Sequence, residues 1–211
     1  MAGLLSCLTT ALAGCGASAP TATSGQVPAA SGQLPADYRP VPAGRSAAYR
    51  LPAVSPAVAR RAAISGLRCT NVTGVSYGIH LELYAHRLVL PVPAGIGVAP
   101  PQRRAGAYVR SGACTYPLRT SEPTGVVIVG RAAVSGARPG VPSLGTLFAV
   151  WGQPLSSSRL AGFRGTVRAF VQGRSWRDPP AQIPLTRHAE IVLEVGGAVP
   201  PHPAYLFPAG L

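Results

Sequence analysis

The sequence predicts an α+β domain, in which a mixed or antiparallel sheet is covered by one main helix. Short segments with the alternating or β-branched pattern of strands occur both before and after a single amphipathic helical segment. Clusters of turn residues separate these segments. Strands on both sides of one helix are typical of the α+β class, and a β-grasp-like arrangement fits this order.

The first 14 residues are predicted to be a lipoprotein signal peptide. The apolar segment Ala2–Ala13 is too short to span a membrane as a helix. Leu12–Cys15 resembles a bacterial lipobox, in which the thiol of Cys15 accepts a diacylglyceryl group. The segment departs from the usual signal-peptide pattern, because no Arg or Lys precedes its apolar residues. The alternative is that these residues form a buried N-terminal helix and that Cys15 follows it by chance. Lipidation would anchor the protein at the outer face of the cytoplasmic membrane.

Residues 15–61 are predicted to be a disordered tether that begins with the lipidated cysteine. Ala, Pro, Ser, Gly and Thr make up 30 of the 46 residues from 16 to 61. Such a segment has too few large apolar side chains to offset the entropy of ordering, and its prolines keep it extended. We therefore expect the globular domain to span residues 62–211, where 14 Arg and 5 acidic residues give a net charge of +9.

The first predicted strand is Ile79–Tyr84, where apolar and polar residues alternate as in a half-buried strand. Its polar face carries His80, Glu82 and Tyr84. A second strand follows at Leu88–Leu90, and His86 with Arg87 forms the expected turn of a hairpin.

The next strand is Val126–Val129, whose uninterrupted β-branched run predicts a central strand covered on both faces. The main helix is expected to begin after Ser143, which can cap it, and to end at Gly152. Its apolar residues lie at helical spacing on one face. They are Leu144, Leu147, Phe148 and Trp151.

Two further strands are predicted after the helix. Thr166–Val171 is followed by the turn signal Gln172-Gly173. Ala189–Val195 alternates, with Ile191, Leu193 and Val195 expected to face inward.

The domain contains two cysteines, Cys69 and Cys114. Two cysteines in an exported domain predict one disulfide between them. A zinc site is the alternative, although neither a CxxC motif nor an adjacent His supports it.

Five segments resemble an uncharacterised family of exported bacterial domains. They are Tyr77–Leu83, Val92–Gly97, Cys114–Gly125, Leu144–Gly152 and Phe207–Leu211. The corresponding family patterns include HIHAHLDV, VPAGIGI, CxYxLHTHDxTG and a helix that ends in FxxWG. The resemblance covers roughly residues 67 to 211, and it implies no particular biochemical activity.

The clustered histidines of that family imply a metal site, because alternate His residues on a strand present imidazoles on one face. In this chain Ser76 and Gly78 stand at the first two His positions, and Leu118–Glu122 lacks both His of the LHTHD motif. The candidate ligands that remain are His80, Glu82 and Glu122, with His86 as a further candidate. Three such ligands could hold a divalent metal, and a hydrogen-bonded structural cluster without a cofactor is the alternative.

Other chemistries lack their motifs. Asp178 is the one Asp in the domain, and no GxSxG elbow accompanies it, so a Ser-His-Asp hydrolase is not expected. The chain has neither a P-loop nor a strand-linked GxGxxG motif for nucleotides. Nucleic acid is not an expected partner, because the arginines are spread along the chain and aromatic residues make up only 6% of it.

These observations predict a membrane-anchored exported lipoprotein whose domain is a non-enzymatic binding or structural module of the cell envelope. An anionic envelope component or another protein is the expected partner of the basic domain. The alternative is a reduced member of a metal-binding family with a divalent-metal site at His80 and the two glutamates.

Overall fold

The structure is a computed structural model that describes residues 40–55, 63–71, 74–131, 140–199 and 204–211. The predicted signal peptide and the predicted lipid acceptor Cys15 lie outside the described residues. Asp37–Leu211 forms one compact unit. Within the described ranges, no helix has both the length and the apolar composition needed to cross a membrane.

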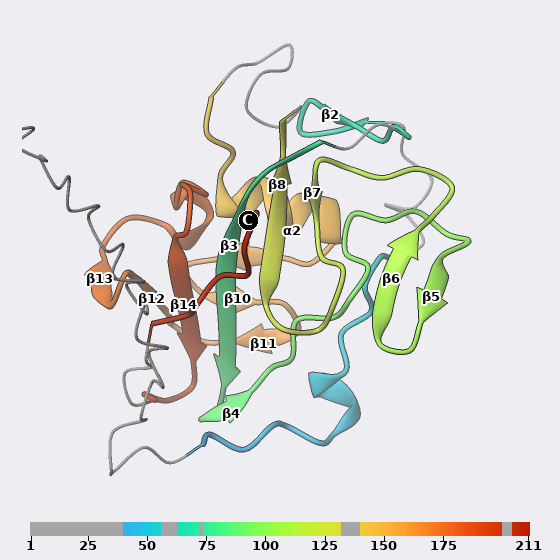
Figure 1. The fold of residues 1–211 in the computed structure, drawn as a ribbon. Helices are drawn as coiled ribbons and strands as arrows, with labels where there is room; N and C mark the ends of the chain where they lie inside the picture. The colour runs from blue at the N-terminus through green and yellow to red at the C-terminus, as the bar shows by residue number, and fades with distance from the viewer. Residues whose placement is uncertain (1–39, 56–62, 72–73, 132–139, 200–203) are drawn as a thin grey trace, which may run out of the picture. The chain divides into compact units, whose positions relative to one another are not determined.

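In the described part of the chain, seven strands form the main sheet, shown in Figure 1. Their order is β13-β12-β14-β3-β8-β7, and β4 pairs with the end of β3. The bounds are β3 Val75–Ala85, β4 Leu88–Val89, β7 Leu118–Arg119, β8 Val126–Gly130, β12 Val167–Val171, β13 Arg174–Trp176 and β14 Glu190–Val195. Because β14 runs parallel to β3 while the other pairs are antiparallel, the sheet is mixed. The predicted α+β class with a mixed sheet and one main helix is confirmed at this level.

The middle of the sheet differs from the prediction. Val126–Val129 does form a largely buried strand, β8, but this strand lies between β3 and β7 near one edge. The centre belongs to β3 and β14, because the 11-residue β3 is long enough to pair with β14, β8 and β4. The place of a strand in a sheet depends on which other strands it pairs with, and the composition of the strand alone does not determine this.

The core lies between the sheet and helix α2, Leu144–Trp151. The backbone N–H of Thr146 donates to Ser143 Oγ at 3.3 Å, and Gly152 ends the helix in the left-handed conformation with φ 75°. Both predicted helix ends are confirmed. The apolar face predicted for this helix is buried, as are the inward residues of β14.

The two predicted turns are also confirmed. His86 and Arg87 both have positive φ, 50° and 65°, and they join β3 to β4. Gln172 and Gly173, with φ of 51° and 71°, join β12 to β13. Two successive residues with positive φ match the right-handed twist of antiparallel strands.

Several short elements were not expected from the sequence. They are η1 Ala47–Tyr49, β1 Ala63–Ile64, β2 Leu67–Arg68, β5 Arg103–Ala105, β6 Tyr108–Ser111, β9 Leu155–Ser156, β10 Arg159–Leu160, β11 Phe163–Arg164 and η2 Pro180–Gln182. The strands among them form two hairpins, β1-β2 and β5-β6, and the small sheet β11-β10-β9. Leu160 of β10 and Phe163 of β11 are buried in the main core beneath the large sheet.

The predicted disulfide is present between Cys69 and Cys114, which are 45 residues apart in sequence. Beside it, Thr70 and Thr115 exchange backbone hydrogen bonds of 3.0 and 2.8 Å. The covalent bond and this pair of hydrogen bonds together fasten the β1-β2 hairpin to the segment that precedes β7.

The packed part of the chain begins earlier than the predicted boundary at residue 62. Residues 40–55, which the sequence analysis assigned to the tether, lie against the domain (blue in Figure 1). Tyr49 is buried and donates a hydrogen bond from its hydroxyl to the Ala85 carbonyl at 2.9 Å. Trp151 Nε1 donates to the Pro52 carbonyl at 2.8 Å. One large aromatic side chain thus holds in place a segment whose average composition resembles a linker.

Candidate functional site

The outer face of the sheet, the face opposite α2, carries the polar residues predicted for β3. The parallel register pairs His80 with Glu190 and Tyr84 with Glu194 of β14. Because residues two apart on a strand share a face, these pairs and Glu82 lie together on the outer face. The register therefore adds two glutamates to the three polar residues that the sequence grouped.

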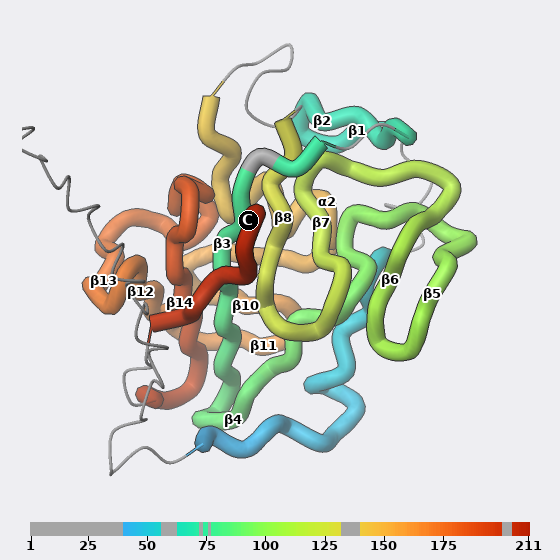
Figure 2. Tube along the Cα trace, in the orientation of Figure 1, coloured from blue at the N-terminus to red at the C-terminus, as the bar shows by residue number. Residues whose placement is uncertain are grey.

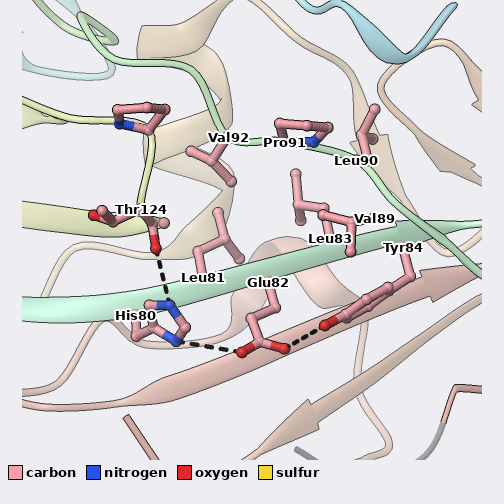
Figure 3. A pocket seen from close by; sticks show the side chains of 12 residues that line it. His80, Leu81, Glu82, Leu83, Tyr84, Val89, Leu90, Pro91, Val92 and Thr124 are labelled. Carbon is pink, nitrogen blue, oxygen red and sulfur yellow. Dashed lines mark hydrogen bonds and ion pairs between the residues drawn. The ribbon is translucent and has the colours of Figure 1, made fainter. Parts of the chain in front are cut away.

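His80 is only 9% exposed, although a polar residue on an open sheet face would be solvated. Its Nε2 donates to the carbonyl of Thr124 at 3.1 Å, and its Nδ1 lies 3.7 Å from a carboxylate oxygen of Glu82. Figure 3 shows the ring held between these two acceptors. Tyr205 stacks on the ring, with centroids 4.0 Å apart and planes inclined by 14°.

Glu82 connects His80 to Tyr84. The Tyr84 hydroxyl donates to the second carboxylate oxygen of Glu82 at 2.6 Å. The three side chains help to line an open pocket of about 330 Å³ at the edge of β3. The segments 89–92 and 123–125 line it as well, together with Leu81 and Leu83, which lie on the other side of β3 from His80 and Glu82 (Figure 3).

The C-terminal segment, residues 204–211, crosses the outer face over β14 and β3 (Figure 2). The backbone N–H of Tyr205 donates to Glu190 at 2.6 Å, and His188 Nε2 donates to the Leu211 carbonyl at 2.7 Å. A Cβ atom added to Gly78 would lie 3.2 Å from Leu211 Cβ. Gly78, which the resemblance aligned with a family His, is therefore covered by apolar chain.

Glu194 and Glu122 complete the acidic surroundings of this segment. Glu194 is 3% exposed, accepts the backbone N–H of Val199 at 3.1 Å and pairs with Arg168. Burial raises the pKa of Tyr205, the negative charge of Glu122 raises it further, and a hydrogen bond with Thr124 opposes both effects. Four of the six acidic residues of this basic chain thus lie at or beside the outer face.

The structure does not bring the three candidate metal ligands into one group. Across the described ranges, no group of three or more His, Cys, Asp or Glu side chains could hold a metal ion. His80 commits Nε2 to a backbone carbonyl, which leaves Nδ1 and the Glu82 carboxylate as facing donors. Two donors are fewer than the three or four protein ligands of a zinc site. The further candidate, His86, lies at the hairpin turn against Phe163.

The geometry also limits acid–base chemistry at His80. In a catalytic triad, the carboxylate orients one ring nitrogen and the other nitrogen is free to take a proton from the nucleophile. Here Nε2 already donates to a carbonyl, and Nδ1 faces the carboxylate. The ring therefore joins the Thr124 segment, β3 and Tyr205, an arrangement that differs from that of a triad histidine.

Sequence reasoning missed Glu190, Glu194 and Tyr205 as members of this site. The two glutamates occupy polar positions of the predicted strand Ala189–Val195, so its alternation indicated their face but not their neighbours. Tyr205 carries no local signal, because its place on His80 arises from a contact between segments far apart in the sequence.

Comparisons with protein-family models, with curated proteins and with solved structures gave no match to this chain.

Proposed function

We propose that this chain is an exported lipoprotein, acylated at Cys15, that displays a non-enzymatic binding domain at the outer face of the cytoplasmic membrane. The observation that carries the proposal is the Cys69–Cys114 disulfide in a chain that begins with a lipobox-like segment. Disulfides form and persist in oxidising compartments outside the cytoplasm. The two features are far apart in sequence, and both fit export.

The binding role is supported by the state of the polar groups on the outer face. Glu190 and Glu194 each accept a backbone hydrogen bond, Glu82 accepts one from its strand neighbour Tyr84, and His80 donates to Thr124. These groups hold the C-terminal segment and the pocket walls in a fixed shape. A preformed pocket that presents a few polar groups in fixed positions is typical of a binding site.

Acylation is tested by mass spectrometry of the protein isolated from membranes of an expressing bacterium. We expect a diacylglyceryl group on Cys15 and cleavage immediately before it. Cys15→Ser should abolish both, whereas Cys7→Ser, which changes a cysteine within the signal peptide, should leave them unchanged. An unmodified Cys15 in the wild-type protein would overturn the proposal.

Elemental analysis separates the binding module from the metal-binding alternative. The oxidised protein, purified without a metal-binding tag, is compared with His80→Ala and with His188→Ala as the matched histidine control. The proposal expects no stoichiometric metal that depends on His80. Near-stoichiometric zinc, copper or iron that is lost only in His80→Ala would instead establish the alternative.

A further inference from the structure

A second pocket, of about 400 Å³, lies where the chain first joins the packed domain. Two arginines of the segment 40–55, Arg45 and Arg50, line it. Its apolar wall is formed by Leu51, Pro91 and Pro93. It therefore combines two cationic groups with an apolar surface.

The segment that carries these arginines is fixed to the domain. The Gly44 N–H donates to the Val89 carbonyl at 2.9 Å, and the Tyr49 ring packs on Phe163 with centroids 4.9 Å apart. A Cβ atom on Gly44 would lie 2.0 Å from the Tyr49 ring, so this close approach requires glycine. Arg45 and Arg50 flank Tyr49 in sequence, and the burial of Tyr49 holds both at the pocket.

Within the described ranges, no counter-charge pairs with either guanidinium group. Among the described residues, neither Arg45 nor Arg50 makes a side-chain hydrogen bond or an ion pair. No acidic residue lines the pocket. Both arginines are exposed, so the five N–H donors of each guanidinium group are available to an outside anion. Arg binds phosphate oxygens in bidentate fashion, which makes phosphate the best-matched anionic group.

We propose that this pocket binds the phosphodiester headgroup of an anionic phospholipid in the membrane that carries the lipid anchor. The inference rests on the proposed function, because the anchor at Cys15 brings the bilayer within reach. Twenty-one residues separate Cys15 from Asp37, where the packed unit begins. Arg45 and Arg50 follow Asp37 by 8 and 13 residues, so the part of the chain that carries them lies close in sequence to the anchor.

The apolar wall supports a lipid over a free phosphate ion. Pro91 and Pro93 offer no backbone N–H and line the same pocket as the two arginines. The glycerol carbons of a phospholipid can contact these rings while its phosphate meets the arginines. An inorganic ion would leave that wall unused.

Vesicle co-sedimentation tests the proposal with the mature chain, residues 15–211, carrying Cys15→Ser so that no acyl group contributes. We expect binding to phosphatidylcholine vesicles that contain phosphatidylglycerol and little binding to pure phosphatidylcholine. Arg45→Gln with Arg50→Gln should lower the partition coefficient at least about tenfold, since each basic residue near an anionic surface strengthens binding. Arg174→Gln with Arg177→Gln, the matched control at the β13 edge, should lower it less than about threefold for the same change in net charge.

If the two double variants lost the same share of vesicle binding, the proposed pocket would be wrong and diffuse attraction between charges would explain the binding. Wild-type binding that does not depend on phosphatidylglycerol would also contradict the proposal. Circular dichroism verifies that each variant is folded. The soluble headgroup glycerophosphoglycerol provides a second arm, and we expect it to compete with the vesicles in the wild type. Binding of this compound without any vesicle binding would overturn the lipid assignment and indicate a soluble phosphodiester. Because the test protein carries no acyl group, failure here is distinct from failure of Cys15 acylation.

Discussion

At the scale of single residues, two acidic side chains of this basic protein hold backbone groups of its own chain. Glu190 accepts the Tyr205 N–H and Glu194 accepts the Val199 N–H. Hydrogen bonds to a carboxylate are stronger than bonds between neutral groups, so they can fix chain that has no regular secondary structure. The C-terminal segment stays on the sheet through the bond from Tyr205 to Glu190 and through ring contacts with His80 and His188.

Tyr205 links this arrangement to pH. Its pKa is raised above the ordinary value of 10.0, first by burial and then by the charge of Glu122. The folded protein therefore keeps a proton at pH values where the unfolded chain has lost it. Stability from this effect is fully present below pH 10.0 and is lost as the pH rises through the higher pKa of the folded state.

We therefore predict that the free energy of unfolding falls as the pH rises above about 10, and that Tyr205→Phe makes this fall shallower. Part of the fall should remain, because burial also raises the pKa of Tyr77. Urea unfolding across this range measures the effect, with Tyr108→Phe as a control at an exposed ring. Glu122→Gln should lower the Tyr205 pKa in an ultraviolet difference titration. An unchanged pKa in that variant would contradict the place assigned to Glu122.

At the scale of elements, the parts that the sequence predicted are those with a local signal. Ser143 and Gly152 mark the two ends of α2 through cap geometry that a few neighbouring residues determine. The turn at His86 and Arg87 is likewise local. The small sheet β11-β10-β9 has strands of only two residues each, which are too short to show a period of two.

The cap of α2 gives a prediction at this scale. Ser143→Ala removes the oxygen that accepts the Thr146 N–H, and it should lower the free energy of unfolding by about 1 kcal/mol. Ser157→Ala changes an exposed serine in the β9-β10 turn and should have almost no effect. Urea denaturation of both variants measures the difference. Equal stability of the two would mean that packing of the apolar face alone determines where the helix begins.

At the scale of the whole molecule, the candidate site was predicted only in part. The alternation of β3 placed His80, Glu82 and Tyr84 on one face, and the structure joins them in one pocket. The residues that pack beside and over them could not be predicted, because their positions depend on the parallel register of β14 with β3 and on the C-terminal segment, residues 204–211. The inclusion of residues 40–55 in the packed unit was missed for a related reason. The burial of a single residue, Tyr49, keeps this segment on the domain, although the average composition of the segment is that of a linker. An average over the whole segment conceals the effect of one residue.

The disulfide is the feature that links the fold to the proposed compartment, and its loss gives the last prediction. Cys69 and Cys114 close a loop of 45 residues, so in the chain-entropy estimate the bond stabilises the fold by about 4 kcal/mol. Cys69→Ala with Cys114→Ala should lower the free energy of unfolding by up to that amount, and reduced wild-type protein should match the double variant.

The loss should be uneven across the molecule, because the disulfide and the Thr70–Thr115 hydrogen bonds fasten β1-β2, whereas α2 and the centre of the sheet have their own buried core. Hydrogen exchange in the double variant should therefore speed up first in residues 63–71 and only later in β3 and β14. Urea unfolding with and without a thiol reductant gives the global value, and exchange measured by mass spectrometry gives the local one. If reduction left both the free energy of unfolding and the exchange rates unchanged, the disulfide would add nothing to the stability of the fold.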